Sequence, residues 1–229
     1  MIFTTVGVGP GDPELVTLKA IHALKDSDLV LIPISAAGRE SVAEGIVAEH
    51  IQGIPRLALI FPMTRNAAER DAKLRAQLEA SRAEWEGAKR IAMPVIGDAA
   101  LYATSAYLYD VLAQLAPSLE LEIVPGISAH AAISTHVGRF LALGDDILTI
   151  IPGTGDTERT ARALSAADTV ALFKPIALRD ALRETVERAG PWRTILRIDR
   201  AGLPDEKIVW GEQALETPDE YLSTLMLWR

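Results

Sequence analysis

The stretch VGVGPGDPEL, residues 6–15, places three glycines between an apolar run and a segment with helical spacing. Residues 2–8 are rich in apolar and β-branched side chains, which predicts a strand, and apolar residues spaced three apart predict a helix over residues 14–26. A strand, a glycine turn and a helix in this order often surround the phosphate groups of a nucleotide. The stretch therefore predicts a βα unit and raises the question of what its loop binds.

The glycine spacing does not match a phosphate-binding loop. The glycines are Gly7, Gly9 and Gly11, and Asp12 stands where the pattern Gly-x-Gly-x-x-Gly needs its third glycine. We expect Asp12 to cap the helix that follows, which leaves less room for an anion at that helix end. The loop is thus predicted to contact a neutral or cationic ligand, with a tight turn that binds nothing as the alternative.

Outward from this stretch, strand-like and helix-like segments alternate, which predicts βαβ units around a largely parallel sheet. The predicted strands are 28–33, 56–61 and 90–96, and the predicted helices are 39–52, 66–88 and 99–115.

The sequence LAPSLE, residues 115–120, interrupts this alternation and is the predicted domain boundary. The fold class is thus α/β, with an N-terminal α/β domain over 1–115, a C-terminal α/β domain over 116–229 and a ligand cleft between them. In the second domain the predicted strands are 119–124, 146–151, 168–173, 194–199 and 205–210, and the predicted helices are 127–138, 157–166, 177–189 and one that begins near 217.

Two more stretches place a glycine directly after a predicted strand. They are PVIGDAALYAT (94–104) and IVPGISAHAA (123–132). Ligands of parallel α/β sheets bind at the carboxyl ends of the strands. We therefore expect the three glycine-containing strand ends to face one cleft.

Composition excludes several classes of function. The 229-residue chain has no cysteine, so thiolate catalysis and cysteine-based zinc sites are excluded. A net charge of −8 does not predict a nucleic-acid partner, and no apolar run reaches the length of a membrane span. The N-terminus resembles a strand rather than a leader, so we expect a cytoplasmic protein. The histidines show no metal-ligand spacing, and no metal site is predicted.

Taken together, three stretches resemble the tetrapyrrole (corrin/porphyrin) methyltransferases. They are residues 6–31, GDAALYAT (97–104) and VPGISAHAA (124–132), in that order along the chain. Within that family, residues 32–47, FPMT (61–64) and DRAGLPDEKIVWG (199–211) look most like the precorrin-2 C20-methyltransferase branch.

The resemblance implies S-adenosylmethionine as the methyl donor, S-adenosylhomocysteine as its product, a tetrapyrrole substrate and a homodimer. The positions that match the family's donor-binding residues are Pro10, Gly97, Asp98, Leu101, Ser128, Ala129, Lys174 and Ala201. The first glycine loop is implied to border the tetrapyrrole, which assigns Gly11 and Asp12 to substrate binding.

Substitution at C20 must release a proton, so a general base is a further expectation. The candidates are Asp98, Asp12, Tyr102 and, as an alternative, His130. A polycarboxylate substrate on an acidic protein also needs a basic lining. The candidates for it are Arg39, Arg65 and Arg139, followed by Lys174, Arg197 and Arg200.

The chain departs from the family pattern at three positions. Ala99 replaces the proline that usually follows Gly-Asp, Ile96 precedes that loop, and Pro175 follows Lys174. The resemblance nevertheless implies a C-methyltransferase of cobalamin biosynthesis that acts at C20 of precorrin-2 or cobalt-factor II. Two alternatives stay open: another tetrapyrrole methylase of the same fold, and a module that binds S-adenosylmethionine without catalysis.

Overall fold

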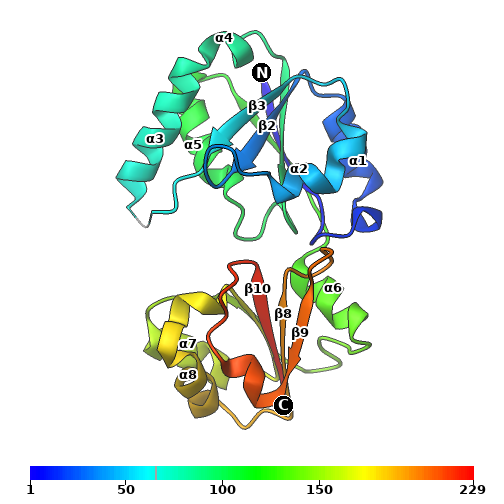
Figure 1. Ribbon diagram of the computed structural model, residues 1–229, viewed down its shortest axis with the longest axis vertical. Helices are drawn as coiled ribbons and strands as arrows, with labels where there is room; N and C mark the ends of the chain where they lie inside the picture. The colour runs from blue at the N-terminus through cyan, green and yellow to red at the C-terminus, as the bar shows by residue number, and fades with distance from the viewer. Residues whose placement is uncertain (65) are drawn as a thin grey trace. The chain divides into compact units, whose positions relative to one another are not determined.

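The computed structural model describes residues 1–64 and 66–229. Over these residues the chain divides into two compact units, Met1–Ser128 and Ala129–Arg229 (Figure 1). Each unit is of the α/β class, as the sequence predicts, and has helices on both faces of its β-sheet.

The sheet of the first unit has the strand order β3-β2-β4-β1-β5, and its strands pair in parallel. The strands are β1 (Ile2–Gly7), β2 (Leu29–Ile34), β3 (Arg56–Ile60), β4 (Arg90–Val95) and β5 (Glu120–Val124). Because the strands are parallel, their carboxyl ends lie at one edge, where α/β proteins place their ligands.

Helices cover this sheet on both sides (Figure 1). They are α1 (Leu18–Lys25), α2 (Val42–Val47), α3 (Ala67–Ala80), α4 (Arg82–Trp85) and α5 (Ser105–Leu115), with short 3-10 helices η1 (Pro13–Leu15) and η2 (Ala48–His50). Buried residues of α1 and α2 share one apolar cluster with the sheet, and those of α3, α4 and α5 share another.

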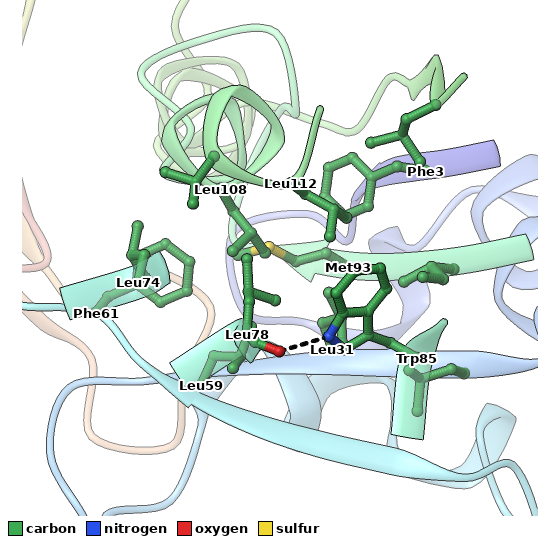
Figure 2. Packing of buried hydrophobic residues seen from close by; sticks show 14 of the residues in the cluster. Phe3, Leu31, Leu59, Phe61, Leu74, Leu78, Trp85, Met93, Leu108 and Leu112 are labelled. Carbon is green, nitrogen blue, oxygen red and sulfur yellow. Dashed lines mark hydrogen bonds between the residues drawn. The ribbon is translucent and has the colours of Figure 1, made fainter. Parts of the chain in front are cut away.

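Figure 2 shows the second of these clusters, in which Leu74 and Leu78 of α3 and Leu108 and Leu112 of α5 pack onto strand residues. The indole of Trp85 is buried there and donates a hydrogen bond to the Leu78 carbonyl at 2.8 Å. The helix that the sequence predicts over 66–88 is thus two helices, joined at Ser81, with an apolar side against the sheet.

The sheet of the second unit is mixed, with the order β6-β7-β10-β8-β9. Its strands are β6 (Leu148–Pro152), β7 (Thr169–Phe173), β8 (Thr194–Asp199), β9 (Lys207–Trp210) and β10 (Ser223–Trp228). Strand β10 pairs antiparallel with both β7 and β8. It follows that β6, β7 and β8 point the same way and end at one edge.

Strand β10 corrects the predicted C-terminal helix. Residues 223–228 form a fully buried central strand, and no helix begins near 217 within the described part of the chain. A short apolar run such as LMLW fits a buried strand as well as a buried helix, so periodicity alone could not separate the two.

Helices of the second unit also lie on both faces of its sheet. They are α6 (Ala129–His136), α7 (Thr157–Ser165) and α8 (Leu182–Ala189), with 3-10 segments η3 (Pro175–Ala181) and η4 (Gly211–Leu215). Residues of α7, α8, η3 and η4 join one apolar cluster, whereas Ile133 of α6 joins the other.

Two boundaries differ from those that the sequence predicts. Strand β5, expected to open the second domain, pairs with β1 in the first sheet, so the compact units meet at Ser128 and Ala129 rather than at 115 and 116. Helix α1 begins at Leu18, because the Thr17 hydroxyl caps it by accepting the Ala20 N–H at 3.1 Å. Among the described helices, none has the length and apolar character needed to cross a lipid bilayer.

Candidate functional site

Three glycine loops meet at the carboxyl ends of β1, β4 and β5. Gly9, after β1, and Gly97, after β4, form an isolated bridge in which each N–H donates to the other's carbonyl, at 3.2 Å and 2.7 Å. Gly126 follows β5 and lies against both other loops. The three glycine-containing strand ends thus lie together in the first unit, and the cleft that they are expected to face stays a prediction.

Close backbone contact explains why two of these positions are glycine. A Cβ added at Gly126 would lie 2.3 Å from the Gly97 carbonyl oxygen and 2.7 Å from the Gly7 carbonyl carbon. A Cβ at Gly7 would lie 2.6 Å from the Gly126 nitrogen. These neighbours are backbone atoms that cannot move aside as a side chain can, so only glycine fits.

The Asp98 carboxylate links the glycine loop after β4 to the glycine loop after β5 through hydrogen bonds. One of its oxygens accepts the Ala100 N–H at 2.8 Å, and the other accepts the Gly126 N–H at 2.9 Å. A carboxylate that accepts two backbone N–H groups holds both loops in place. Asp98 therefore shapes the junction, whatever else it contacts.

Gly97 differs from its two glycine neighbours. Its φ is +76°, a conformation that glycine adopts without strain, and a Cβ built there would meet nothing within 4 Å. The junction thus has an open side at Gly97, against which a ligand can approach the backbone. Pro10, in the first loop, is buried, and Leu101, four residues after Gly97, is half-buried.

Tyr102 adopts a left-handed backbone, with φ of 53°. A bulky residue in this region is rare and strained, and such residues gather at functional sites. Its side chain is 43% exposed, and burial of the remainder raises the pKa of the phenol above its usual range. The phenol therefore stays protonated at neutral pH, so it can donate a hydrogen bond but is a poor general base.

Asp12 and Gly11 lie in the first loop, before η1. One Asp12 carboxylate oxygen accepts the Glu14 N–H at 2.9 Å, so Asp12 caps the short 3-10 helix rather than the long helix expected over 14–26. Gly11 is buried beside it.

The second unit has a comparable edge, where β6, β7 and β8 end. Gly153 follows β6, and its N–H donates to the Phe173 carbonyl at 2.6 Å. A Cβ there would lie 2.5 Å from the Lys174 carbonyl oxygen. Lys174 and Arg200 follow β7 and β8 with φ of 54° and 55°. Lys174 and Ala201, both predicted to bind the methyl donor, thus lie at one edge of this sheet.

The remaining residues that the sequence predicts for the site lie in different parts of the chain. Ser128 and Ala129 lie where the two units join, and His130, one residue further, packs edge-on against the Phe173 ring at 5.9 Å. Arg39 is exposed beyond the carboxyl end of β2. Arg65 lies outside the described residues.

Two arginines suggested for the basic lining already contact other groups of the second unit. The Arg139 guanidinium lies over the Trp228 ring at 5.1 Å, and Trp228 pairs with the first residues of β7 and β8, at the sheet edge opposite to Lys174. Arg197 is buried and forms an ion pair with Asp199. Arg197 is thus paired within the protein, and a role for Arg139 in substrate binding stays a prediction.

Sequence reasoning did not single out Gly153, Asp199 or Ser223, although all three shape the second edge. The sequence does contain a signal for Gly153, since IIPG (150–153) repeats the IVPG pattern of residues 123–126. Within residues 1–64 and 66–229, no group of three or more histidine, aspartate or glutamate side chains is arranged to hold a metal ion.

Known relatives match this chain along nearly its whole length. A relative from Methanocaldococcus jannaschii, named "Probable cobalt-precorrin-2 C(20)-methyltransferase", is 32% identical over 97% of this chain and 92% of its own. The cobalt-precorrin-2 C(20)-methyltransferase of Salmonella typhimurium is 29% identical over 97% of this chain and 94% of its own.

Solved structures share the fold. Uroporphyrin-III C-methyl transferase from Thermus thermophilus, complexed with S-adenyl homocysteine, superposes with a TM-score of 0.70 at 22% identity, covering 100% of this chain and 98% of the other. A cobalt precorrin-4 methyltransferase gives 0.70 at 24% identity, covering 99% and 94%. The family model for tetrapyrrole (corrin/porphyrin) methylases matches residues 3–215. The chain therefore belongs to the tetrapyrrole (corrin/porphyrin) methylase family.

Proposed function

We propose that this protein is an S-adenosylmethionine-dependent methyltransferase that methylates C20 of precorrin-2 or of its cobalt complex in cobalamin biosynthesis. The support is similarity over nearly the full length to relatives named for that reaction, one at 32% identity with cobalt-precorrin-2 in its name and one at 26% with precorrin-2. Because both forms of the substrate occur among these names, the choice between them is left to experiment.

The observation that carries this proposal is the junction of three glycine loops. It presents backbone groups at the open side of Gly97, and the nearby Asp98 and Asp12 carboxylates would repel a phosphate. S-adenosylmethionine fits such a site, since it carries a sulfonium and an amino acid group but no phosphate. When bound, it supplies an electrophilic methyl group.

In this proposal, the residues of the chain hold and orient the reactants. Pro10, Gly97, Asp98 and Leu101 hold the donor from the first unit, with Ser128 at its end, and Ala129, Lys174 and Ala201 hold it from the second unit. Methyl transfer depends mainly on bringing the acceptor carbon into line with the methyl group.

The proton released from C20 needs an acceptor. Both oxygens of Asp98 and one of Asp12 already accept backbone N–H groups, and Tyr102 stays protonated at neutral pH. We propose that Tyr102 donates a hydrogen bond to a substrate carboxylate. The proton leaves to Asp12, whose second oxygen accepts no hydrogen bond from the residues that the structure describes, or to water.

A substrate with several carboxylates needs cations near it. Arg39, which lies beyond β2, and Arg65 are the proposed contacts from the first unit. Arg200 is a weaker candidate, since its Nε donates to the Asp205 carboxylate at 2.6 Å.

We also propose that the protein is a homodimer, as the family resemblance implies, and that it acts in the cytoplasm, as the sequence leads us to expect. The edge strand β5 offers a surface for a second copy, because Leu121 and Ile123 on it are 41% and 47% exposed. Light scattering after gel filtration tests the dimer, and a Leu121→Lys variant should shift it toward the monomer.

The reaction is tested by incubating the protein with S-adenosylmethionine and either precorrin-2 or cobalt-precorrin-2 in the absence of oxygen. Mass spectrometry should find the mass of one added methyl group on at least one of them, and NMR should place it at C20. A methyl group at another carbon would favour a different methylase of this fold. Binding of S-adenosylhomocysteine without turnover would favour the non-catalytic alternative.

A further inference from the structure

Lys174 and Arg200 adopt the same unusual backbone at matching places. Each directly follows a strand of the second sheet, β7 or β8, and each has φ near +55° although neither is glycine. Such residues keep this conformation only where neighbouring groups enforce it. The contacts that enforce this backbone conformation at Lys174 and Arg200 therefore also shape the edge that carries Lys174 and Ala201.

The start of β10 holds both residues. The Lys174 N–H donates to the Ser223 carbonyl at 3.0 Å, and the Arg200 N–H donates to the Leu222 carbonyl at 2.7 Å. Because β10 lies between β7 and β8, these neighbouring carbonyls fix the chain on both sides of it. The position of residues 222 and 223 thus sets the position of both turns.

A buried polar network in turn fixes Ser223. Its hydroxyl lies 2.5 Å from the Asp199 carboxylate and 2.9 Å from the Glu220 carbonyl, both of which can accept its proton. The Arg197 Nε lies 3.1 Å from the same carboxylate. The Arg197 and Asp199 side chains are only 6% and 10% exposed. Arg197 also donates to the carbonyls of Ala214 at 3.3 Å and Glu216 at 2.5 Å, which ties down the segment that leads into β10.

A buried ion pair of this kind is a poor source of net stability, because the cost of removing both charges from water offsets their attraction. Apolar residues of similar volume would fill the same space. The network does, however, fix a geometry, since each of its hydrogen bonds has a defined direction. Ser223, which contacts Asp199 in this network, is also the residue whose carbonyl accepts the Lys174 N–H.

We propose that Arg197, Asp199 and Ser223 are positioning residues that hold Lys174 and the Arg200–Ala201 turn in the shape that binds the methyl donor. This inference rests on the proposed function for its ligand. The geometric part of it, that the network fixes the two turns, can be tested without any ligand.

The first measurement is amide hydrogen exchange, resolved by NMR, at Lys174 and Arg200. Ser223→Ala removes the hydroxyl that contacts Asp199 and the Glu220 carbonyl, and it should speed exchange at these two amides roughly five- to tenfold, as expected when one hydrogen bond is lost. The matched control is Thr185→Val, which removes a buried hydroxyl of α8 that donates to the carbonyl of Ala181, the last residue of η3, at 2.6 Å. It should leave both amides unchanged.

A second variant, Arg197→Met with Asp199→Leu, replaces the ion pair by apolar residues. Its melting temperature should stay within a few degrees of wild type, roughly as found for such replacements elsewhere, while exchange at both amides rises. Unchanged exchange in both variants would overturn the proposal. So would an equal rise in exchange across the whole second unit, because that would show a loss of stability only.

Calorimetric titration with S-adenosylhomocysteine then tests the link to the ligand. Binding to Ser223→Ala should be roughly five- to tenfold weaker than to wild type and to Thr185→Val, again the effect of about one hydrogen bond. Faster exchange with unchanged affinity would overturn the role in donor binding. If the wild-type protein itself binds no S-adenosylhomocysteine, the proposed function fails, and the exchange data still decide whether the network fixes the turns.

Discussion

At the scale of single residues, Gly126 lies at the point where three loops are closest. A Cβ there would approach the Gly97 carbonyl oxygen to 2.3 Å, so Gly126→Ala must push backbone apart. We expect it to destabilise the first unit by roughly 3 kcal/mol, the upper end of overpacking costs. Thermal unfolding followed by circular dichroism measures this loss.

Gly45→Ala is the matched control for that variant. Gly45 lies in α2, where an added Cβ would meet nothing within 4 Å. Glycine weakens a helix interior relative to alanine, so the variant should be more stable than wild type by about 0.5–1 kcal/mol. Equal stability of Gly126→Ala and Gly45→Ala would contradict the close junction described above.

Tyr102 gives a prediction about pH. Because burial raises the pKa of its phenol, the group stays protonated across the neutral range and should not limit the rate there. Tyr102→Phe should raise KM for the tetrapyrrole roughly fivefold, the value of one hydrogen bond, and leave KM for S-adenosylmethionine unchanged. Steady-state rates between pH 6 and 9 should give wild-type and variant profiles of the same shape. A variant whose kcat falls a hundredfold, with a changed profile, would instead identify Tyr102 as the base.

At the scale of elements, Asp28 ties the start of β2 to the start of β4. One of its oxygens accepts the N–H groups of Lys89 at 2.8 Å and Arg90 at 2.9 Å. These bonds, first that to Arg90 and then that to Lys89, lower the pKa of Asp28 below its usual value of 3.8. The folded state therefore binds this proton less readily than the unfolded state does.

The sign of the pH dependence follows from that lowered pKa. The contribution of Asp28 to stability is fully present above pH 3.8 and is lost as the pH falls through the lower folded-state value. Asp28→Asn should thus melt below wild type at pH 6, and the difference should shrink as the pH falls below 4. Thermal melts at several pH values measure it. A constant difference at every pH would show that the carboxylate charge has no part in this contact.

Elements of the first unit were the more predictable, for a physical reason. Its parallel strands are local apolar runs, each followed by a helix, so short-range patterns specify them. Helix α1 begins at Leu18 rather than at the predicted residue 14, because Thr17 caps α1 whereas Asp12 caps the short helix η1. In the second unit, β10 pairs with strands that lie earlier in the chain, and nothing local separates its apolar run from a helix.

The same contrast between local patterns and contacts of distant segments applies to the candidate site. The turn at Gly97 and Asp98 was predictable, because a glycine turn after a strand carries its own signal. That Gly126 packs against Gly7, and that Arg197 is paired with Asp199, depends on contacts between distant segments. The burial of Arg197 could not be predicted, since most arginines are exposed.

At the scale of the whole molecule, the resemblance assigns donor-binding residues to both compact units, such as Gly97 in one and Lys174 in the other. A ligand that binds only the folded state stabilises it, by about 2.7 kcal/mol at a hundred times its Kd. If S-adenosylhomocysteine contacts both units, unfolding of either unit must release it. The amide exchange rates of buried residues in α3 and in α8 should then both decrease when S-adenosylhomocysteine is added.

The same experiment tests the question posed by the first glycine loop. ATP shares the adenosine group but carries phosphates, which the Asp12 and Asp98 carboxylates should repel. At equal concentration, ATP should leave exchange in α3 and α8 unchanged, whereas S-adenosylhomocysteine slows it in both. Protection of only one helix by S-adenosylhomocysteine would confine the donor site to one unit. Equal protection by ATP would mean that the loop accepts phosphates despite its carboxylates, and the argument from Gly7, Gly9 and Asp12 would be wrong.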